Sequence, residues 1–138
     1  MMVKSIMLID DDFDDAELFA EALSETANNI EFTHFDDGRT AVETLARSSR
    51  LPDLLFLDIN LPSFSGWQCL TEIKKHDSLN DLYVIMYTTS TVEREKEIAK
   101  DLGASGFITK PQSYVELKKI LKGILSLQLD NIREKSLF

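Results

Sequence analysis

Three short segments of this chain are almost wholly apolar, and they constrain the fold more than any other feature. They read IMLI at residues 6–9, LLFL at residues 54–57 and YVIMY at residues 83–87. A continuous apolar run of this length is typical of a strand buried on both faces, as in a parallel sheet covered by helices. With two weaker runs, the pattern predicts five strands, at Ser5–Ile9, Ile30–Phe35, Leu54–Leu57, Leu82–Tyr87 and Gly106–Ile108.

Helical periodicity fills the intervals between these runs. Leu18, Phe19, Ala22 and Leu23 lie on one face of a helix, and four further intervals carry similar apolar stripes. Five strands that alternate with five helices in about 125 residues predict an α/β fold, an open, doubly wound parallel sheet.

Length and charge limit the possible functions. A chain of 138 residues is expected to form one domain, here residues 1–125 without a second or output domain. Its 15 basic and 24 acidic residues give a net charge of −9, which disfavours direct binding to nucleic acid. No apolar run is long enough to span a membrane. The single cysteine, Cys69, fits a cytoplasmic location, and we expect it to be a buried apolar filler.

Acidic residues directly follow two of the predicted core strands. The first strand runs into Asp10, Asp11 and Asp12, and the third runs into Asp58. In an open α/β sheet, ligands bind beyond the carboxyl ends of the strands, so these carboxylates should converge. Such a cluster repels itself unless a cation lies within it, and Mg²⁺ is the expected ion. Asp12, together with the next two aspartates, is also expected to cap and charge the first helix.

A lysine and a threonine follow the other two strands of the predicted site. Lys110 comes after the fifth strand and Thr88 after the fourth. An ammonium group and a hydroxyl at this position are suited to bind the oxygens of a transferring phosphoryl group. Each residue alone has an ordinary interpretation, as a surface ion pair or a helix cap, but their joint occurrence with the aspartates favours a phosphoryl site.

With these residues in place, the chain resembles the receiver domains of bacterial response regulators, the CheY-like family. The resemblance covers roughly residues 4–125 and rests on four segments in order: LIDDD, DINLPSFSG, YTTS and GASGFITKP. It implies a flavodoxin-like (CheY-like) fold, a five-stranded parallel sheet in the order 2-1-3-4-5 with five helices.

The resemblance also implies roles for the acidic residues. Asp58 aligns with the phosphoacceptor and Asp11 with a direct Mg²⁺ ligand, while Asp10 would orient a metal-bound water. Asn60 aligns with the residue whose backbone carbonyl completes the metal site. The cofactor implied is Mg²⁺, with Mn²⁺ as a possible substitute.

The remaining family positions are occupied as well. Thr88 and Lys110 would each bind a phosphoryl oxygen, and Phe107 aligns with the aromatic switch residue. The family pattern further implies a cis bond between Lys110 and Pro111. Thr89 stands where the family often has alanine, so its extra bulk is expected to bear on access to the acyl phosphate.

The implied function is a phosphorylation-activated signalling receiver. A sensor histidine kinase or a histidine phosphotransfer protein would donate the phosphoryl group to Asp58, and the domain would catalyse its own phosphorylation and dephosphorylation without being a turnover enzyme. The surface of the fourth helix, fifth strand and fifth helix would then change and regulate an unknown protein target. The chain is expected to be a monomer or a phosphorylation-dependent dimer.

Three other functions compete with this one. A haloacid-dehalogenase-type phosphatase would use Asp10 as its nucleophile, but Asp14 stands where that motif has Thr or Val. An EF-hand loop starting at Asp10 would need glycine at its sixth position, where the chain has Asp15. A receiver-shaped adaptor that never needs phosphate would not require the acidic cluster. Neither His34 nor His76 is expected to relay phosphate.

Residues 126–138 exceed what the fold needs. Leu129 and Ile132 continue the apolar spacing of the last helix. This stretch is interpreted as a C-terminal extension of the last helix or a tail, and a loose chain end is favoured over a partner contact.

Overall fold

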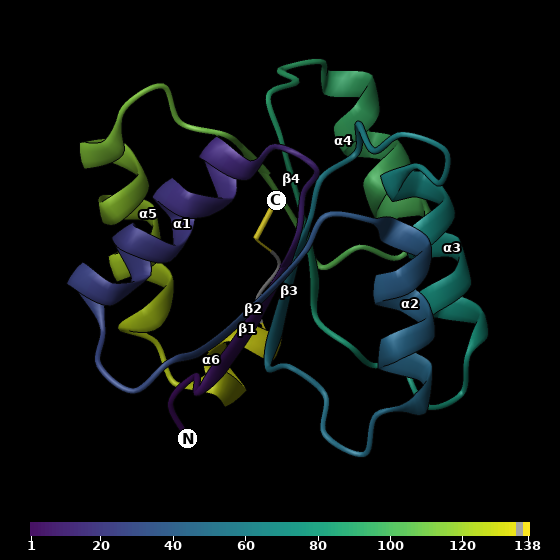
Figure 1. Cartoon of the computed structure of the whole chain (residues 1–138), viewed down its shortest axis with the longest axis horizontal. Helices are drawn as coiled ribbons and strands as arrows, with labels where there is room; N and C mark the ends of the chain where they lie inside the picture. Colours follow the sequence, from purple (N-terminus) through teal and green to yellow (C-terminus); the bar gives the residue numbers. More distant parts are fainter. Residues whose placement is uncertain (135–136) are drawn as a thin grey trace.

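The computed structural model describes residues 1–134 and 137–138, and its centre is a parallel sheet of five strands (Figure 1). The strand order is β2-β1-β3-β4-β5, as the family resemblance implied. The predicted strands are confirmed, with shifts of one or two residues at their ends. Their bounds are β1 Ser5–Ile9, β2 Glu31–Phe35, β3 Leu54–Leu57, β4 Val84–Thr88 and β5 Gly106–Thr109.

Helices cover both faces of this sheet. Figure 1 shows α1 and α5 side by side on one face, and α2, α3 and α4 on the other. The connection from β1 to β2 therefore passes over one face and the three later connections pass over the other, which is the doubly wound arrangement. The helices are α1 Phe13–Thr26, α2 Gly38–Arg47, α3 Gly66–Lys75, α4 Glu93–Asp101, α5 Tyr114–Leu125 and α6 Leu129–Glu134.

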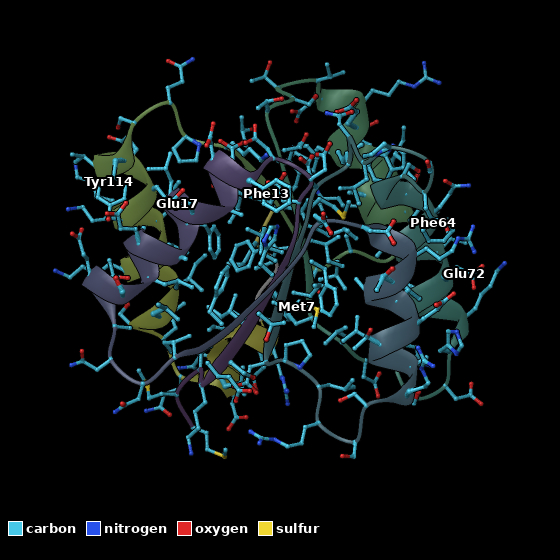
Figure 2. The ribbon with its side chains drawn as sticks, viewed as in Figure 1. Met7, Phe13, Glu17, Phe64, Glu72 and Tyr114 are labelled. Carbon is cyan, nitrogen blue, oxygen red and sulfur yellow. The ribbon has the colours of Figure 1, made fainter. Side chains whose placement is uncertain are left out.

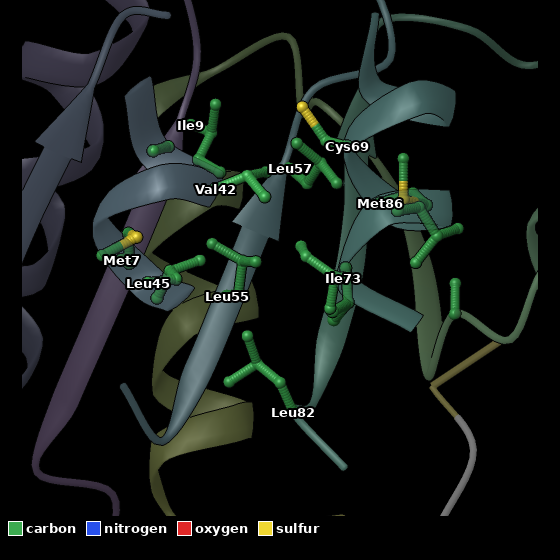
Figure 3. Packing of buried hydrophobic residues seen from close by; sticks show 14 of the residues in the cluster. Met7, Ile9, Val42, Leu45, Leu55, Leu57, Cys69, Ile73, Leu82 and Met86 are labelled. Atoms are coloured by element: carbon green, nitrogen blue, oxygen red, sulfur yellow. The ribbon is translucent and has the colours of Figure 1, made fainter. Parts of the chain in front are cut away.

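The sheet divides the core into two apolar layers, and β3 contributes side chains to each of them. Leu55 and Leu57 face α2 and α3, in the layer drawn in Figure 3. Phe56 faces α1 and α5, and the centre of its ring lies 5.0 Å from the centre of the Phe19 ring. All four residues of β3 are buried, which explains why its sequence lacks polar alternation. Cys69 is buried in the first layer, as expected.

Polar side chains cap the first turns of α1 and α3. Asp12 accepts a hydrogen bond from the Asp15 amide at the start of α1, which confirms its predicted capping role. Ser65 and Gln68 form a reciprocal capping box at the start of α3. These caps fix where each helix begins relative to the strand before it.

The last helix does not continue beyond residue 125, and the favoured alternative, a loose tail, does not describe the next residues either. Helix α5 ends at Leu125, and the chain turns through residues 126–128 into the separate helix α6, so the described residues form six helices in place of the expected five. The apolar spacing continues because Leu129 and Ile132 are buried against the layer that α1 and α5 cover. The Leu129 amide also donates to the carbonyl of Met1, which ties this segment to the opposite end of the chain.

Burial of α6 has a measurable consequence for stability. The side chain of Ile132 is fully buried, whereas its neighbour Asn131 is exposed. Ile132→Ala should lower the free energy of unfolding by about 2–4 kcal/mol, because it removes buried methyl groups and leaves a cavity. Asn131→Ala is the matched control and should change it by less than about 0.5 kcal/mol. Urea unfolding measures both, and equal midpoints would contradict the packing of α6.

Candidate functional site

Four predicted site residues meet at the carboxyl edge of the sheet because each ends or follows one of its parallel strands. Asp10 follows β1, Asp58 follows β3, Thr88 is the last residue of β4 and Lys110 follows β5. Ladder hydrogen bonds continue through them. The Asp58 amide donates to the Ile9 carbonyl at 3.0 Å, and the Lys110 amide donates to the Thr88 carbonyl at 2.6 Å. The site is therefore held directly by the hydrogen bonds of the sheet.

The ammonium group of Lys110 lies among three carboxylates. Its Nζ is 2.8 Å from Asp10 Oδ2, 2.9 Å from Asp15 Oδ2 and 3.1 Å from Asp58 Oδ2. It also lies 5.6 Å from the centre of the Tyr87 ring. Burial alone lowers the pKa of Lys110, but its contacts with Asp10 and Asp15 outweigh burial and hold the pKa above its ordinary value. The side chain is therefore a fixed positive charge.

Asp10 is the most deeply buried carboxylate of the site. Its burial raises the pKa of this carboxyl to about 6, although the nearby Lys110 ammonium and the Asp12 amide oppose the shift. Oδ1 accepts a hydrogen bond from the Asp12 amide at 2.9 Å. Oδ2 forms the 2.8 Å ion pair with Lys110 and has no other polar partner among the described residues. Lys110 is therefore the contact that offsets the charge on this buried oxygen.

The acidic residues fit a divalent cation. One oxygen from each of Asp10, Asp11 and Asp58 can be chosen so that all three lie within 4.8 Å of one another. Asp11 is exposed beside the two buried residues, so the cluster opens to solvent on one side. Carboxylate oxygens are the ligands that hard cations prefer. With Asp15 included, the site holds four carboxylates and one ammonium group, which contacts three of them, and the remaining negative charge favours a cation.

Asp58 is held by both of its oxygens. Oδ1 accepts from the Asn60 amide at 3.1 Å, and Oδ2 accepts from Lys110. The side-chain amide of Asn60 also reaches Thr88 Oγ1 at 3.5 Å. Sequence reasoning gave only the backbone of Asn60 a role, so this side-chain contact was missed.

Thr88 and Phe107 are both buried beside this edge. Thr88 is fully buried and its hydroxyl also lies 3.5 Å from the Ser90 amide. Phe107 packs in the apolar layer that contains Met86 and Ala104. Thr89 is exposed, so its extra bulk lies at the surface of the domain. The expected cis bond before Pro111 is wrong, because this peptide bond is trans.

Two further residues, Asp15 and His34, contact the site although no role there is predicted for them. Asp15 was expected only to charge the start of α1, yet its carboxylate contacts Lys110. The available signal was its place in the first turn of a helix that starts just above the sheet edge. His34 Nε2 lies 2.7 Å from the Asp10 carbonyl, so this nitrogen donates. Phe13 stands at the start of α1 (Figure 2), with its ring edge-on to His34 at 5.8 Å.

Comparison with known proteins decides the family. The family model for the response regulator receiver domain matches residues 6–122. The chain belongs to the response regulator receiver family. It is a receiver domain of the kind found in two-component signalling, whose general class of partner is a histidine kinase. The family match leaves no support for the phosphatase or the EF-hand interpretation.

Relatives and solved structures agree with this assignment. Response regulator Rcp1 of Synechocystis sp. is 31 % identical, over 94 % of this chain and 91 % of Rcp1. The polar-differentiation response regulator DivK of Brucella anthropi is 31 % identical, over 90 % of this chain and 98 % of DivK. The crystal structure of the phosphorylated cyanobacterial phytochrome response regulator RcpA superposes with a TM-score of 0.84 at 32 % identity, covering 94 % of this receiver and 96 % of RcpA. The crystal structure of the Mn²⁺-bound form of Rcp1 superposes with a TM-score of 0.79 at 31 % identity. The match covers 90 % of this receiver and 93 % of the Rcp1 chain.

A glycine holds the α3 helix against the proposed acceptor segment of this receiver. A Cβ atom on Gly66 would lie 2.2 Å from the Asp58 carbonyl oxygen and 2.6 Å from the Ile59 Cα. The Gly66 amide donates to the Ile59 carbonyl at 2.9 Å, so the two backbones are in direct contact. Only glycine permits this approach.

Substitution of two glycines should therefore have opposite effects. Gly66→Ala should lower the free energy of unfolding by about 1–3 kcal/mol or more, because two backbone segments must move apart. Gly123→Ala is the matched control, since Gly123 lies in the last turn of α5 and a Cβ atom there meets nothing within 4 Å. It should stabilise the domain by about 0.5–1 kcal/mol through helix propensity. Thermal and urea unfolding distinguish the two, and equal stability of both variants would contradict the close approach at Gly66.

Proposed function

We propose that this receiver accepts a phosphoryl group on Asp58 from a phosphohistidine of a sensor kinase or a histidine phosphotransfer protein. The observation that supports this most directly is the placement of Asp58. Its carboxylate is nearly buried, carries the Lys110 ammonium on one oxygen and lies next to the cation-binding cluster. Asp10 shares these properties but is fully buried, whereas Asp58 keeps a small exposed fraction and is linked to Thr88 through Asn60.

The proposed reaction transfers a phosphoryl group from an imidazole nitrogen to a carboxylate oxygen. A carboxylate oxygen of Asp58 attacks phosphorus, the new P–O bond forms as the P–N bond breaks, and the electron pair leaves with the imidazole. The Lys110 ammonium offsets negative charge on the phosphoryl oxygens, and the Thr88 hydroxyl donates to one of them. Hydrolysis of the resulting acyl phosphate in the same site returns Asp58 to its free form.

A divalent cation completes the proposed site, and Mg²⁺ is the ion we assign. Asp11 and Asp58 would bind it directly, Asp10 would act through a water molecule and Asn60 would contribute its backbone carbonyl. When bound, the ion supplies positive charge that offsets the carboxylates and the phosphoryl oxygens. The Mn²⁺-bound structure of Rcp1 and the close approach of Asp10, Asp11 and Asp58 support this assignment.

Phosphorylation is proposed to act on the surface formed by α4, β5 and α5. Thr88 would move toward the phosphoryl group and Phe107 would respond, because both are buried on adjacent strands. This surface would then regulate a downstream protein. We place the protein in the cytoplasm. Among the described residues, no helix has the length and hydropathy that a bilayer crossing requires.

The acceptor is tested with a small phosphoryl donor. Intact mass spectrometry after incubation with acetyl phosphate and Mg²⁺ should show one phosphoryl adduct on the wild type. Asp58→Asn should show none, because the amide is a far poorer nucleophile than the carboxylate. Asp14→Asn is the control, since Asp14 is exposed at the start of α1. An adduct that persists in Asp58→Asn would move the acceptor elsewhere, and an adduct on Asp10 would revive the phosphatase interpretation.

The cation site is tested by binding rather than by activity. Asp11→Asn should weaken Mn²⁺ binding by about tenfold or more, because it removes one charged ligand from a cluster of three. Asp14→Asn should leave the affinity unchanged. Titration calorimetry with Mn²⁺, followed by competition with Mg²⁺, measures both. Equal affinities of the two variants would remove Asp11 from the metal site.

A further inference from the structure

The free edge of β5 is occupied by a distant segment of the same chain. The strand order leaves β5 at one end of the sheet. Leu137 pairs with Gly106 as a parallel bridge, its amide donates to the Ser105 carbonyl at 3.1 Å, and its carbonyl accepts from the Phe107 amide at 3.3 Å. Leu137 thus acts as one residue of an added strand and satisfies backbone groups that an edge strand otherwise leaves exposed.

Gly106 provides the space for this contact. A Cβ atom at Gly106 would lie 2.7 Å from the Leu137 Cβ, and the three nearest atoms it would meet all belong to Leu137. A side chain at position 106 would therefore displace this segment before it disturbed any other part of the fold. The lack of a side chain at Gly106 therefore leaves room for Leu137 at the edge of β5.

The two residues of this segment pack against both layers of the core. Leu137 packs against the layer that contains α5, whereas Phe138 packs against the layer that contains Ala99 of α4 and Phe107 of β5. The ammonium group of Lys100, also on α4, lies 5.1 Å from the centre of the Phe138 ring. The segment therefore contacts both α4 and β5, two elements of the proposed signalling surface.

We propose that Leu137 and Phe138 are an intramolecular strap that holds β5 and α4 in the unphosphorylated arrangement. This inference rests on the proposed function, because it assumes that phosphorylation of Asp58 changes the α4–β5–α5 surface. The strap binds the backbone of Phe107, the aromatic residue expected to respond to phosphorylation. Contacts made only in the resting arrangement stabilise that arrangement, so removal of the strap shifts the domain toward the phosphorylated one.

Three proteins test the strap: the wild type, a chain that lacks residues 137 and 138, and Gly106→Ala in the full chain. The first measurement is amide exchange by NMR without any phosphoryl donor. Both altered proteins should exchange the Phe107 amide about tenfold faster or more, because its acceptor is lost. The Lys110 amide is the internal control, since it donates to Thr88 on the other side of β5 and should keep its rate.

The second measurement is the initial rate of Asp58 phosphorylation by acetyl phosphate in excess Mg²⁺. Both altered proteins should react about fivefold faster than the wild type, because the strap no longer opposes the phosphorylated arrangement. Gly106→Ala made in the shortened chain should add nothing further, since the glycine acts through Leu137. An additional effect of that double change would show that Gly106 matters for β5 itself and would count against the strap.

Other outcomes overturn the proposal in separate ways. Unchanged exchange at Phe107 would show that the segment does not occupy the β5 edge, and unchanged phosphorylation rates would show that it occupies the edge without opposing phosphorylation. A Phe107 protection that depends on protein concentration, with a dimer in sedimentation, would assign the strand to a second copy. Absence of an adduct from every protein would overturn the proposed function and the strap's regulatory role, while Phe107 exchange would still decide where the segment binds.

Discussion

The contact between one buried ammonium group and three carboxylates is the interaction on which this site depends. Asp10, Asp15 and Asp58 come from different elements and would repel one another without Lys110. Lys110 offsets only part of their charge, so the site remains negative and able to bind a cation. Removal of one member of such a buried cluster leaves uncompensated charge, which costs more than the net stability of the intact cluster. The arrangement therefore balances stability of the resting fold against readiness to bind a divalent ion and a phosphoryl group.

Apolar packing on both faces of the sheet stabilises the edge that carries these buried charges. The apolar layers above and below β3 fix the sheet, and ladder hydrogen bonds extend that order to Asp58 and Lys110. Gly66 brings the start of α3 against the backbone of Asp58, which restrains the backbone of the proposed acceptor. Catalytic groups held in this way need little rearrangement when charge develops on a transferring group.

Much of this architecture could be predicted from the sequence because its strongest signals are local. An unbroken apolar run indicates a strand buried on both faces, and the residue that follows it lies at the sheet edge, so Asp58 and Lys110 were found without coordinates. Strand order required the family resemblance, since periodicity does not tell which strands are neighbours. Asp15 was missed because its role depends on how α1 is rotated above the edge. The turn before α6 was missed because Leu129 and Ile132 keep the apolar spacing of α5, and a short break leaves that spacing almost unchanged.

β5 lies between the proposed phosphorylation site and the segment of Leu137 and Phe138. On one side it pairs with β4, where the Lys110 amide binds the Thr88 carbonyl, and on the other it pairs with Leu137. A central strand is held by two neighbours of the sheet, whereas an edge strand has one neighbour and leaves backbone groups unpaired. Because β5 leads directly into Lys110, a displacement of β5 would reach the ammonium group that contacts Asp58. If the proposed function holds, whatever occupies the outer edge of β5 would change the free energy of phosphorylation, and phosphorylation would change the affinity for that occupant by the same amount.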